Sequence, residues 1–331
     1  MACKTCERVD LWSPQSAGTT FEHSVFAERV KPHYANLSII SPSPAYRLPA
    51  WVPIAAEGID ALTHPVRKRK PCRTFAGAKQ CGLEWDEWML VQALIRPDST
   101  VLELGARYGT TSCTLAGALN NSGRLVSVEP DGSVHAALLA NRASHWCNFH
   151  LLNGTVSLRP HAMLEQDADA RDVDGKYGTR FRTAASVASD KVPAGRGAKW
   201  QPLVPNVPFR QLEAYLGGPR INTLLIDCEG CIGSFLDGQE ELLDGIELLL
   251  LEEDWLMIEA INETYVGRWY DVFRRHGLEL IWRIRDTTAP RETWSKILHH
   301  SAWARGGLRG RPTCQQYAAA HNYSWRILNC I

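Results

Sequence analysis

The stretch "VLELGARYGTTS", residues 101–112, indicates the fold class of this chain. Its strand-forming residues include an acid, Glu103, and two glycines, Gly105 and Gly109, precede hydroxyl residues that can open a helix. A strand, a glycine turn and a helix in this order are typical of the start of a β-α-β unit. Ligands of open α/β sheets bind at the carboxyl ends of strands, so this turn is the first candidate for a binding site.

The segments on both sides of this turn alternate between strand and helix patterns. Expected strands cover 100–104, 124–129, 149–153, 221–227, 246–252 and 278–284. Helical patterns lie before, between and after them, over 82–95, 109–119, 132–143, 209–216, 233–243 and 255–275. The alternation predicts an α/β fold with a doubly wound, mostly parallel Rossmann-like sheet and helices on both faces.

The ends of the chain and one internal segment lack this pattern. Residues 1–80 carry scattered prolines and predict an irregular N-terminal arm or cap, followed by the main domain over 81–285. Within that domain, 156–203 is polar and rich in glycine, which predicts an inserted flexible loop. Residues 286–331 form a C-terminal extension, whose last residues, "SWRILNCI", could return as an edge strand.

Composition excludes several classes of protein. The 36 basic residues equal the 36 acidic ones, so whole-chain charge gives no reason to expect nucleic acid or an anionic membrane as the main partner. The N-terminus lacks the apolar core of a secretory signal, and no run of apolar residues is long enough for a membrane segment. We therefore expect a cytoplasmic protein, in which Cys113, Cys147 and Cys228 are free, buried thiols.

The glycine turn favours one cofactor over another. A dinucleotide site requires the pattern Gly-x-Gly-x-x-Gly. At its three glycine positions this chain has Glu103, Gly105 and Tyr108. The spacing acid-x-Gly-x-x-x-Gly instead suits S-adenosylmethionine, and a second acid should then end the next strand to accept hydrogen bonds from both ribose hydroxyls. Glu129 stands there. The alternative is a glycine turn that only packs a helix on a sheet.

Three segments together resemble a known family. "VLELGARYGTTS", "VSVEPDG" and "INTLLIDCEGCIGSFLDG" are similar, in order and spacing, to segments of the FkbM-type methyltransferases, class I enzymes that depend on S-adenosylmethionine. The resemblance covers roughly residues 83–285, and its most diagnostic feature is the Asp-x-Glu-Gly after the fourth strand of the domain. It implies a sheet of class I methyltransferase type.

The resemblance also implies a role for each matching residue. Glu103, Gly105 and Gly109 would line the methionine and ribose side of the cofactor, and Glu129 would hold the ribose. Asp227 would face the methyl-transfer site with Glu229 beside it. The remaining predicted cofactor contacts are the turn residues Ala106 and Pro130.

The predicted reaction is methylation of oxygen on a small molecule or carbohydrate. Asp227 and Glu229 are the candidate bases, and because strand side chains alternate, we expect only one of them, Asp227, to reach the acceptor. Helix capping is the alternative role for each of these acids. No metal site is expected, since the Cys-x-x-Cys pairs at 3–6 and 228–231 lie far apart in sequence.

Two residues depart from the family pattern. Arg107 replaces the usual asparagine in the first turn, and Ile232 stands where a glutamate is common. They motivate the rival hypothesis, a catalytically inactive methyltransferase-fold protein that serves as a binding module. A nicotinamide oxidoreductase is disfavoured by the missing third glycine. The number of subunits is not predicted.

Overall fold

The computed structural model describes most of the region from 84 to 320 and short pieces before it. The described residues are 7–10, 38–41, 75–77, 84–159, 161–165, 180–183, 199–200, 204–216, 219–228, 231–253, 263–285 and 299–320. The predictions that fall outside these ranges include the catalytic role of Glu229, the edge strand in "SWRILNCI" and the first part of the helix expected over 255–275.

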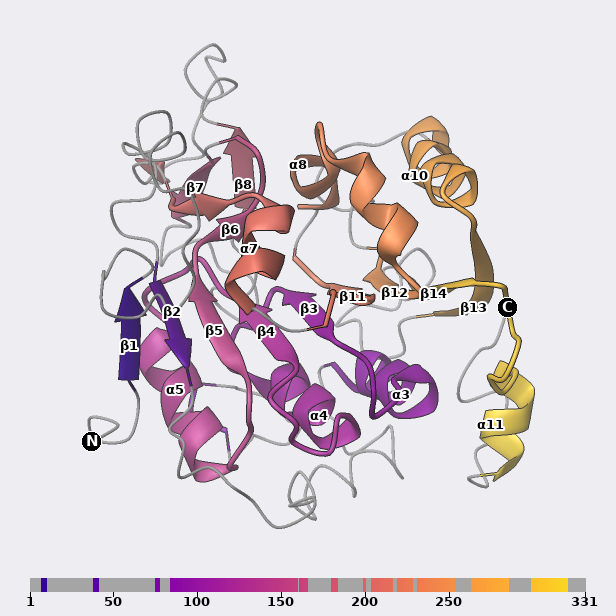
Figure 1. The fold of residues 1–331 in the computed structure, drawn as a ribbon, viewed down its shortest axis with the longest axis horizontal. Helices are drawn as coiled ribbons and strands as arrows, with labels where there is room; N and C mark the ends of the chain where they lie inside the picture. Colours follow the sequence, from indigo (N-terminus) through magenta and orange to yellow (C-terminus); the bar gives the residue numbers. More distant parts are fainter. Residues whose placement is uncertain are drawn as a thin grey trace.

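A nine-stranded sheet forms the centre of the described part of the chain, in the order β1-β2-β5-β4-β3-β11-β12-β14-β13 (Figure 1). Its strands are β1 Glu7–Asp10, β2 Ser38–Ser41, β3 Val101–Leu104, β4 Leu125–Val128, β5 His150–Asn153, β11 Thr223–Ile226, β12 Leu248–Glu252, β13 Leu278–Arg285 and β14 His299–Arg305. The five central strands, β5 to β12 in spatial order, are parallel. β3 pairs with both β4 and β11, so strand order reverses between β3 and β11. This confirms the predicted doubly wound, mostly parallel Rossmann-like sheet.

Near the β13 edge, the sheet contains an antiparallel strand. β14 lies between β12 and β13 and runs antiparallel to both. The sheet therefore continues beyond residue 285, where the predicted main domain ends. β1 and β2, from the predicted N-terminal arm, add an antiparallel pair at the opposite edge, beside β5.

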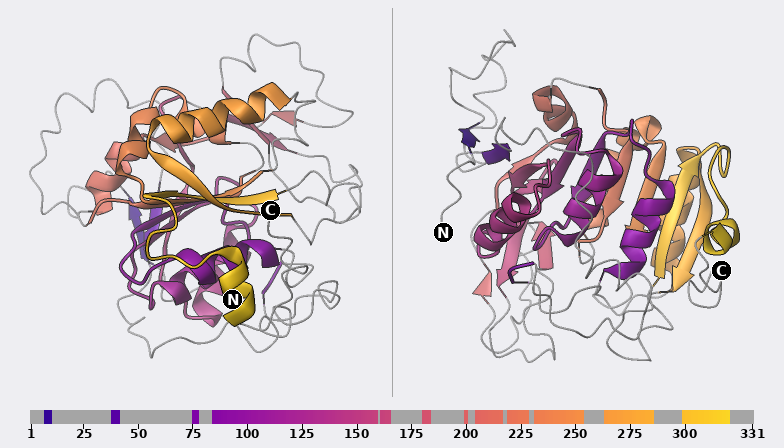
Figure 2. Two further views of the ribbon diagram at one scale, coloured as in Figure 1. Left: turned by 90° about the vertical axis from the view of Figure 1, so that its right-hand side faces the viewer. Right: turned by 90° about the horizontal axis from the view of Figure 1, so that it is seen from below.

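Helices cover both faces of the sheet (Figure 2). On one face lie α3 Trp85–Leu94, α4 Thr110–Ala118, α5 His135–Ser144 and, near the β13 edge, α11 Cys314–Ala320. On the other lie α7 Phe209–Leu216, α8 Ile232–Leu236, the 3-10 turn η2 Glu240–Gly245 and α10 Glu263–Arg275. Strand side chains alternate between these layers: Leu224 and Ile226 belong to the core under α7 and α8, and Leu225 to the core under α3 and α4. Burial on both faces explains the continuous apolar runs of the central strands.

The segment predicted as an inserted loop contains short strands. β6 Thr155–Val156 pairs in parallel with β10 Asn206–Val207, next to the main sheet. β7 His161–Glu165 pairs antiparallel with β8 Arg180–Thr183 and with β9 Lys199–Trp200. These pairings fix the two ends of the segment, around 157–161 and 204–207.

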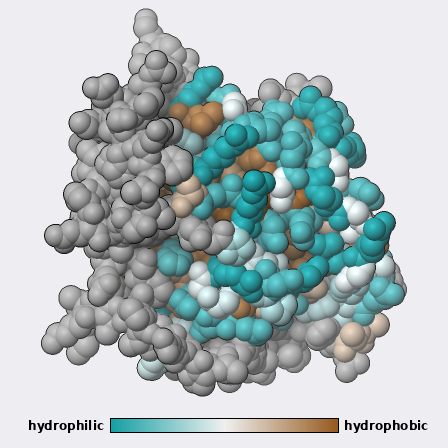
Figure 3. Space-filling model, viewed as in Figure 1, coloured by the Kyte–Doolittle hydropathy of each residue, from teal (hydrophilic) through white to brown (hydrophobic). Residues whose placement is uncertain are grey.

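None of the helices within the described ranges has the features of a membrane span. No helix there is both long enough and apolar enough to cross a lipid bilayer. On the face shown in Figure 3, the described residues are mainly hydrophilic, and hydrophobic atoms lie in recesses between them.

The prediction of free thiols is wrong. Cys113 on α4 forms a disulfide with Cys147, which follows α5, and Cys228 forms one with Cys231. Sequence spacing could not show the first pair, because the packing of α4 beside α5 brings residues 34 positions apart to a Cα–Cα distance of 5.1 Å. None of the described cysteines is a free thiol. Disulfides are rare in the cytosol, so the structure gives no support to the cytoplasmic expectation.

Candidate functional site

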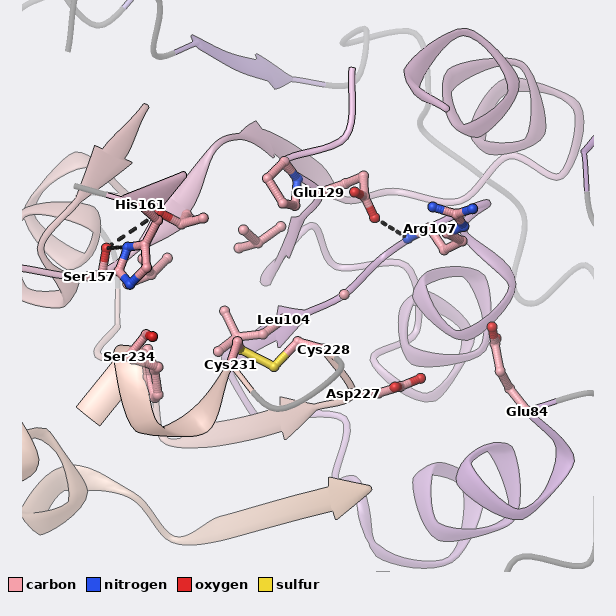
Figure 4. Close-up of a pocket in the computed structure, with 16 residues that line it drawn as sticks. Glu84, Leu104, Arg107, Glu129, Ser157, His161, Asp227, Cys228, Cys231 and Ser234 are labelled. Carbon is pink, nitrogen blue, oxygen red and sulfur yellow. Dashed lines mark hydrogen bonds between the residues drawn. A yellow bond between two sulfur atoms is a disulfide. The ribbon is translucent and has the colours of Figure 1, made fainter. Parts of the chain in front are cut away.

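A cavity opens at the carboxyl ends of β3, β4 and β11, beside the point where strand order reverses (Figure 4). Together with the open space at its mouth, it encloses about 760 Å³. Of the predicted site residues, Gly105, Glu129, Pro130 and Asp227 line it. Glu103, Ala106 and Gly109 do not.

The backbone conformation and the close packing at position 105 require a glycine. Its φ is +102°, a left-handed conformation that side chains disfavour. A Cβ at this position would lie 1.6 Å from the backbone carbonyl oxygen of Asp227, where no atom fits. The backbone N–H groups of Gly105 and Ala106 both donate to the Val128 carbonyl, at 3.0 Å each. The turn is therefore held between the ends of β4 and β11, so that its backbone forms part of the cavity wall.

The next residues of the turn also have left-handed backbone. Gly109, the residue before α4, has a φ of +81°, but a Cβ there would make only ordinary contacts, so its conformation alone explains the glycine. Arg107 has a φ of +44°. Asparagine is commoner than arginine at such positions. In this chain, an ion pair of 3.3 Å between the Arg107 guanidinium and Asp131 helps to fix the turn.

Glu129 is oriented by two backbone donors. Its Oε2 accepts the N–H of Arg107 and its Oε1 accepts the N–H of Asp131, both at 2.8 Å. The side chain is 4% exposed, and burial raises its pKa to about 7, although the nearby Arg107 charge and the two N–H groups lower it. Above this pKa the side chain is a carboxylate, in which each oxygen has two lone pairs, so each keeps one for a ligand. The arrangement presents two adjacent acceptors at the cavity.

Glu103 lies behind the turn. Its side chain is fully buried, and Oε2 accepts a hydrogen bond of 2.6 Å from the Ser112 hydroxyl of α4. Burial raises its pKa to about 8. The structure thus places Glu103 between β3 and α4, where it anchors the helix that follows the turn.

Two carboxyl groups lie on the same side of the cavity (Figure 4). Asp227 follows β11, as predicted, and its N–H donates to the Leu104 carbonyl at 3.0 Å. Glu84, immediately before α3, was not predicted; its Oε2 accepts hydrogen bonds from Thr110 and Thr111. Its position next to a helix start gave no functional signal in the sequence. The cavity therefore has an acidic side next to the first turn.

A third carboxyl group, Glu87, lies buried behind Glu84. The Thr111 hydroxyl is 2.8 Å from Glu84 Oε2 and 2.7 Å from Glu87 Oε2, and it accepts the Trp88 indole N–H at 3.0 Å. A hydroxyl has one proton, so it donates to one carboxyl group, and the other must carry a proton to donate back. Burial, reinforced by the charges of Asp227 and Glu84, raises the pKa of Glu87 well above its usual value. Glu87 therefore holds the proton.

The opposite side of the cavity carries a histidine that was not predicted from the sequence. Ser157 donates its hydroxyl proton to the Arg159 carbonyl at 2.9 Å, so its oxygen accepts from His161 Nδ1 at 3.1 Å. Burial lowers the pKa of His161, so the ring is neutral and its Nε2 carries a lone pair. That atom is buried and has no partner among the described residues. It is an available acceptor for a ligand N–H.

Glu253, directly after β12, lies away from the cavity. Glu253 is fully buried, accepts the Tyr270 hydroxyl at 2.5 Å and pairs with the Arg283 guanidinium at 2.8 Å. It lines no part of the cavity. Glu253 therefore joins β12, α10 and β13.

Comparison with known proteins gives partial structural overlap and no sequence match. No protein-family model and no curated protein matches the chain. A fibrillarin pre-rRNA processing protein of Methanococcus jannaschii is 12% identical, with a TM-score of 0.40 over 82% of this chain and 91% of that one. An O-methyltransferase from Bacillus cereus in complex with SAH is 12% identical, with a TM-score of 0.37 over 75% and 89%. An rRNA methylase from Streptococcus thermophilus is 10% identical, with a TM-score of 0.37 over 67% and 93%. This overlap is too loose to carry a functional argument, and the fold assignment rests on the strand order itself.

Proposed function

We propose that the protein is an S-adenosylmethionine-dependent methyltransferase that methylates oxygen on a small molecule or carbohydrate, as the FkbM resemblance implies. The observation that carries the proposal is the Glu129 carboxylate. It ends the strand next to the glycine turn, faces the cavity, and is fixed by the N–H groups of Arg107 and Asp131. Two neighbouring ribose hydroxyls match its two free acceptor positions.

The two sides of the cavity suit the two ends of the cofactor. His161 Nε2 is a buried acceptor on the side away from Glu84 and Asp227, and it suits the amino group of an adenine base. Glu84 and Asp227 form the acidic side, which suits the cationic methionine end. The Gly105 backbone packs directly against the Asp227 carbonyl and has no side chain. The middle of the ligand can therefore approach this backbone closely.

The cofactor supplies an activated methyl group, and the chain's own residues position the acceptor and take its proton. Asp227 is partly buried at the end of β11 and faces the cavity, where a carboxylate within hydrogen-bond reach can remove a hydroxyl proton. Holding the acceptor oxygen in line with the methyl group supplies much of the remaining acceleration. Glu129, Gly105 and Pro130 belong to the proposed cofactor site, and a role for Glu229 remains a prediction.

Calorimetric titration with S-adenosylmethionine tests the proposal. Wild type should bind, and Glu129→Ala should bind about tenfold more weakly or worse, since a charged hydrogen-bond acceptor is lost. Glu247→Ala is the matched control, because Glu247 is an exposed glutamate at the amino end of β12. Thermal unfolding of each variant separates a lost site from a lost fold. No binding by folded wild type would overturn the proposal; binding without turnover on any acceptor would favour the inactive binding module.

A further inference from the structure

The Cys228–Cys231 disulfide lies in the wall of the cavity. Both cysteines line it and both are partly exposed (Figure 4). The sulfur atoms are therefore reachable by a small molecule that enters the cavity. The proposed methyl transfer has no use for them.

The second disulfide of the described residues provides a contrast. Cys113 and Cys147 are 3% and 4% exposed, and their bond closes a sequence separation of 34 residues. The Cys228–Cys231 bond closes a separation of only 3. A shorter loop gains less stability from its crosslink, and exposed disulfides exchange more readily than buried ones. The cavity disulfide should open first.

The cavity disulfide adjoins the proposed site through Asp227. Cys228 follows Asp227 directly, and a Cβ on Gly105 would meet the Asp227 carbonyl at 1.6 Å and the Cys228 Cα at 3.4 Å. Cys231, at the other end of the crosslink, accepts the N–H of Phe235 near the end of the short helix α8. The crosslink thus ties Cys228, next to Asp227 and the glycine turn, to Cys231 at the start of α8.

We propose that Cys228–Cys231 is a thiol–disulfide exchange site, with a dithiol as its reaction partner, and that its opening weakens cofactor binding. A thiolate of the dithiol attacks one cysteine sulfur, and the other cysteine leaves as a thiolate that takes up a proton. The second thiol of the reagent, as its thiolate, then attacks the reagent sulfur of the mixed disulfide, and the remaining cysteine leaves as a thiolate that also takes up a proton. Two electrons and two protons pass to Cys228 and Cys231, and the dithiol becomes a disulfide. This inference rests on the proposed function.

Opening of the Cys228–Cys231 disulfide should lower the affinity for the cofactor. Opening frees the chain next to Asp227 and the Gly105 turn, so ligand binding must then order it, at an entropic cost. The affinity should fall by about fivefold or more, the lower end of typical couplings between sites. Linkage requires the reverse effect as well, so a bound ligand should make the disulfide harder to reduce.

The experiment titrates the full chain with dithiothreitol, alkylates the thiols formed, and locates them by peptide mass spectrometry. Cys228 and Cys231 should be labelled at lower dithiothreitol concentrations than Cys113 and Cys147, which serve as the internal control. Calorimetry with S-adenosylhomocysteine on oxidised and selectively reduced protein should show the loss of affinity. A folded Cys228→Ala/Cys231→Ala variant should bind like the reduced protein and be insensitive to dithiothreitol.

The outcomes separate this inference from the proposed function. Equal labelling of both pairs, or unchanged affinity after Cys228–Cys231 has opened, overturns the inference and leaves the proposed function standing. Absence of S-adenosylhomocysteine binding in both redox states overturns both. If the double variant does not fold, the comparison of oxidised and selectively reduced wild-type protein still tests the inference.

Discussion

The backbone carbonyl of Asp227 occupies the space that a side chain on Gly105 would need. This contact joins the first and fourth strands of the central parallel set, β3 and β11, at the point where strand order reverses. It links the predicted cofactor turn to the predicted catalytic acid. A change at either residue should therefore affect both the stability of the fold and the shape of the cavity.

Gly105→Ala should destabilise the protein and abolish cofactor binding. The new methyl group overlaps the Asp227 carbonyl, and a φ of +102° is strained for alanine, so we expect a loss of about 3 kcal/mol or more in the free energy of unfolding. Urea unfolding measures it. Gly132→Ala is the control, since a Cβ there meets nothing within 4 Å. Equal stability of the two variants would contradict the described junction.

The unliganded protein should become less stable as pH rises from about 4.5 to about 8. Burial raises the pKa of Glu129 to about 7 and of Glu103 to about 8, from 4.5, so the folded state keeps protons that the unfolded state has lost. The stability that these groups contribute is fully present below their pKa in the unfolded state. It is lost as the pH rises through their pKa values in the folded state. Each group contributes a slope of up to about 1.4 kcal/mol per pH unit.

Glu103→Gln isolates one of these groups. The amide resembles the protonated carboxyl group and can still accept the Ser112 hydroxyl. Urea unfolding at several pH values should therefore give a flatter slope for this variant than for wild type. A slope equal to that of wild type would show that Glu103 does not hold a proton in the folded state.

His161→Leu should reduce the discrimination between purine bases. Wild type should prefer S-adenosylhomocysteine over S-inosylhomocysteine, which carries oxygen in place of the amino group that His161 Nε2 would accept. Loss of one buried acceptor should weaken S-adenosylhomocysteine binding by about fivefold or more and narrow the preference. His161→Gln, which keeps an acceptor, should restore part of the preference for S-adenosylhomocysteine. An unchanged ratio of dissociation constants for His161→Leu would remove His161 from the site.

Asp227→Asn should separate binding from chemistry. The side chain keeps its size but loses its basicity, so turnover should fall by about 10²- to 10⁴-fold, the usual contribution of a general base. Affinity for S-adenosylhomocysteine should fall by a much smaller factor, because Glu84 still supplies an acid on that side of the cavity. Single-turnover kinetics with an acceptor found by screening measures the first quantity and calorimetry the second. Full turnover by Asp227→Asn would leave Glu84 and Glu229 as the candidate bases.

The central sheet was predictable from the sequence because its strands are buried on both faces and read as apolar runs, as in Leu248–Leu251. The same pattern placed Glu129 and Asp227 at strand ends that meet at one cavity. The place of β14 was not predictable, since its pairing with β12 and β13 depends on long-range contacts. His161 was missed for the same reason: β6–β10 pairing and the Ser157 hydrogen bond bring it to the cavity from a segment without periodicity.

A crystal structure of the protein with S-adenosylhomocysteine would show whether the cavity is a cofactor site. We predict both ribose hydroxyls within hydrogen-bond distance of Glu129, the adenine amino group at His161 Nε2, and the thioether sulfur on the side of Asp227. Ligand bound away from Glu129, or crystals that take up none at saturating concentration, would contradict the proposed cofactor site.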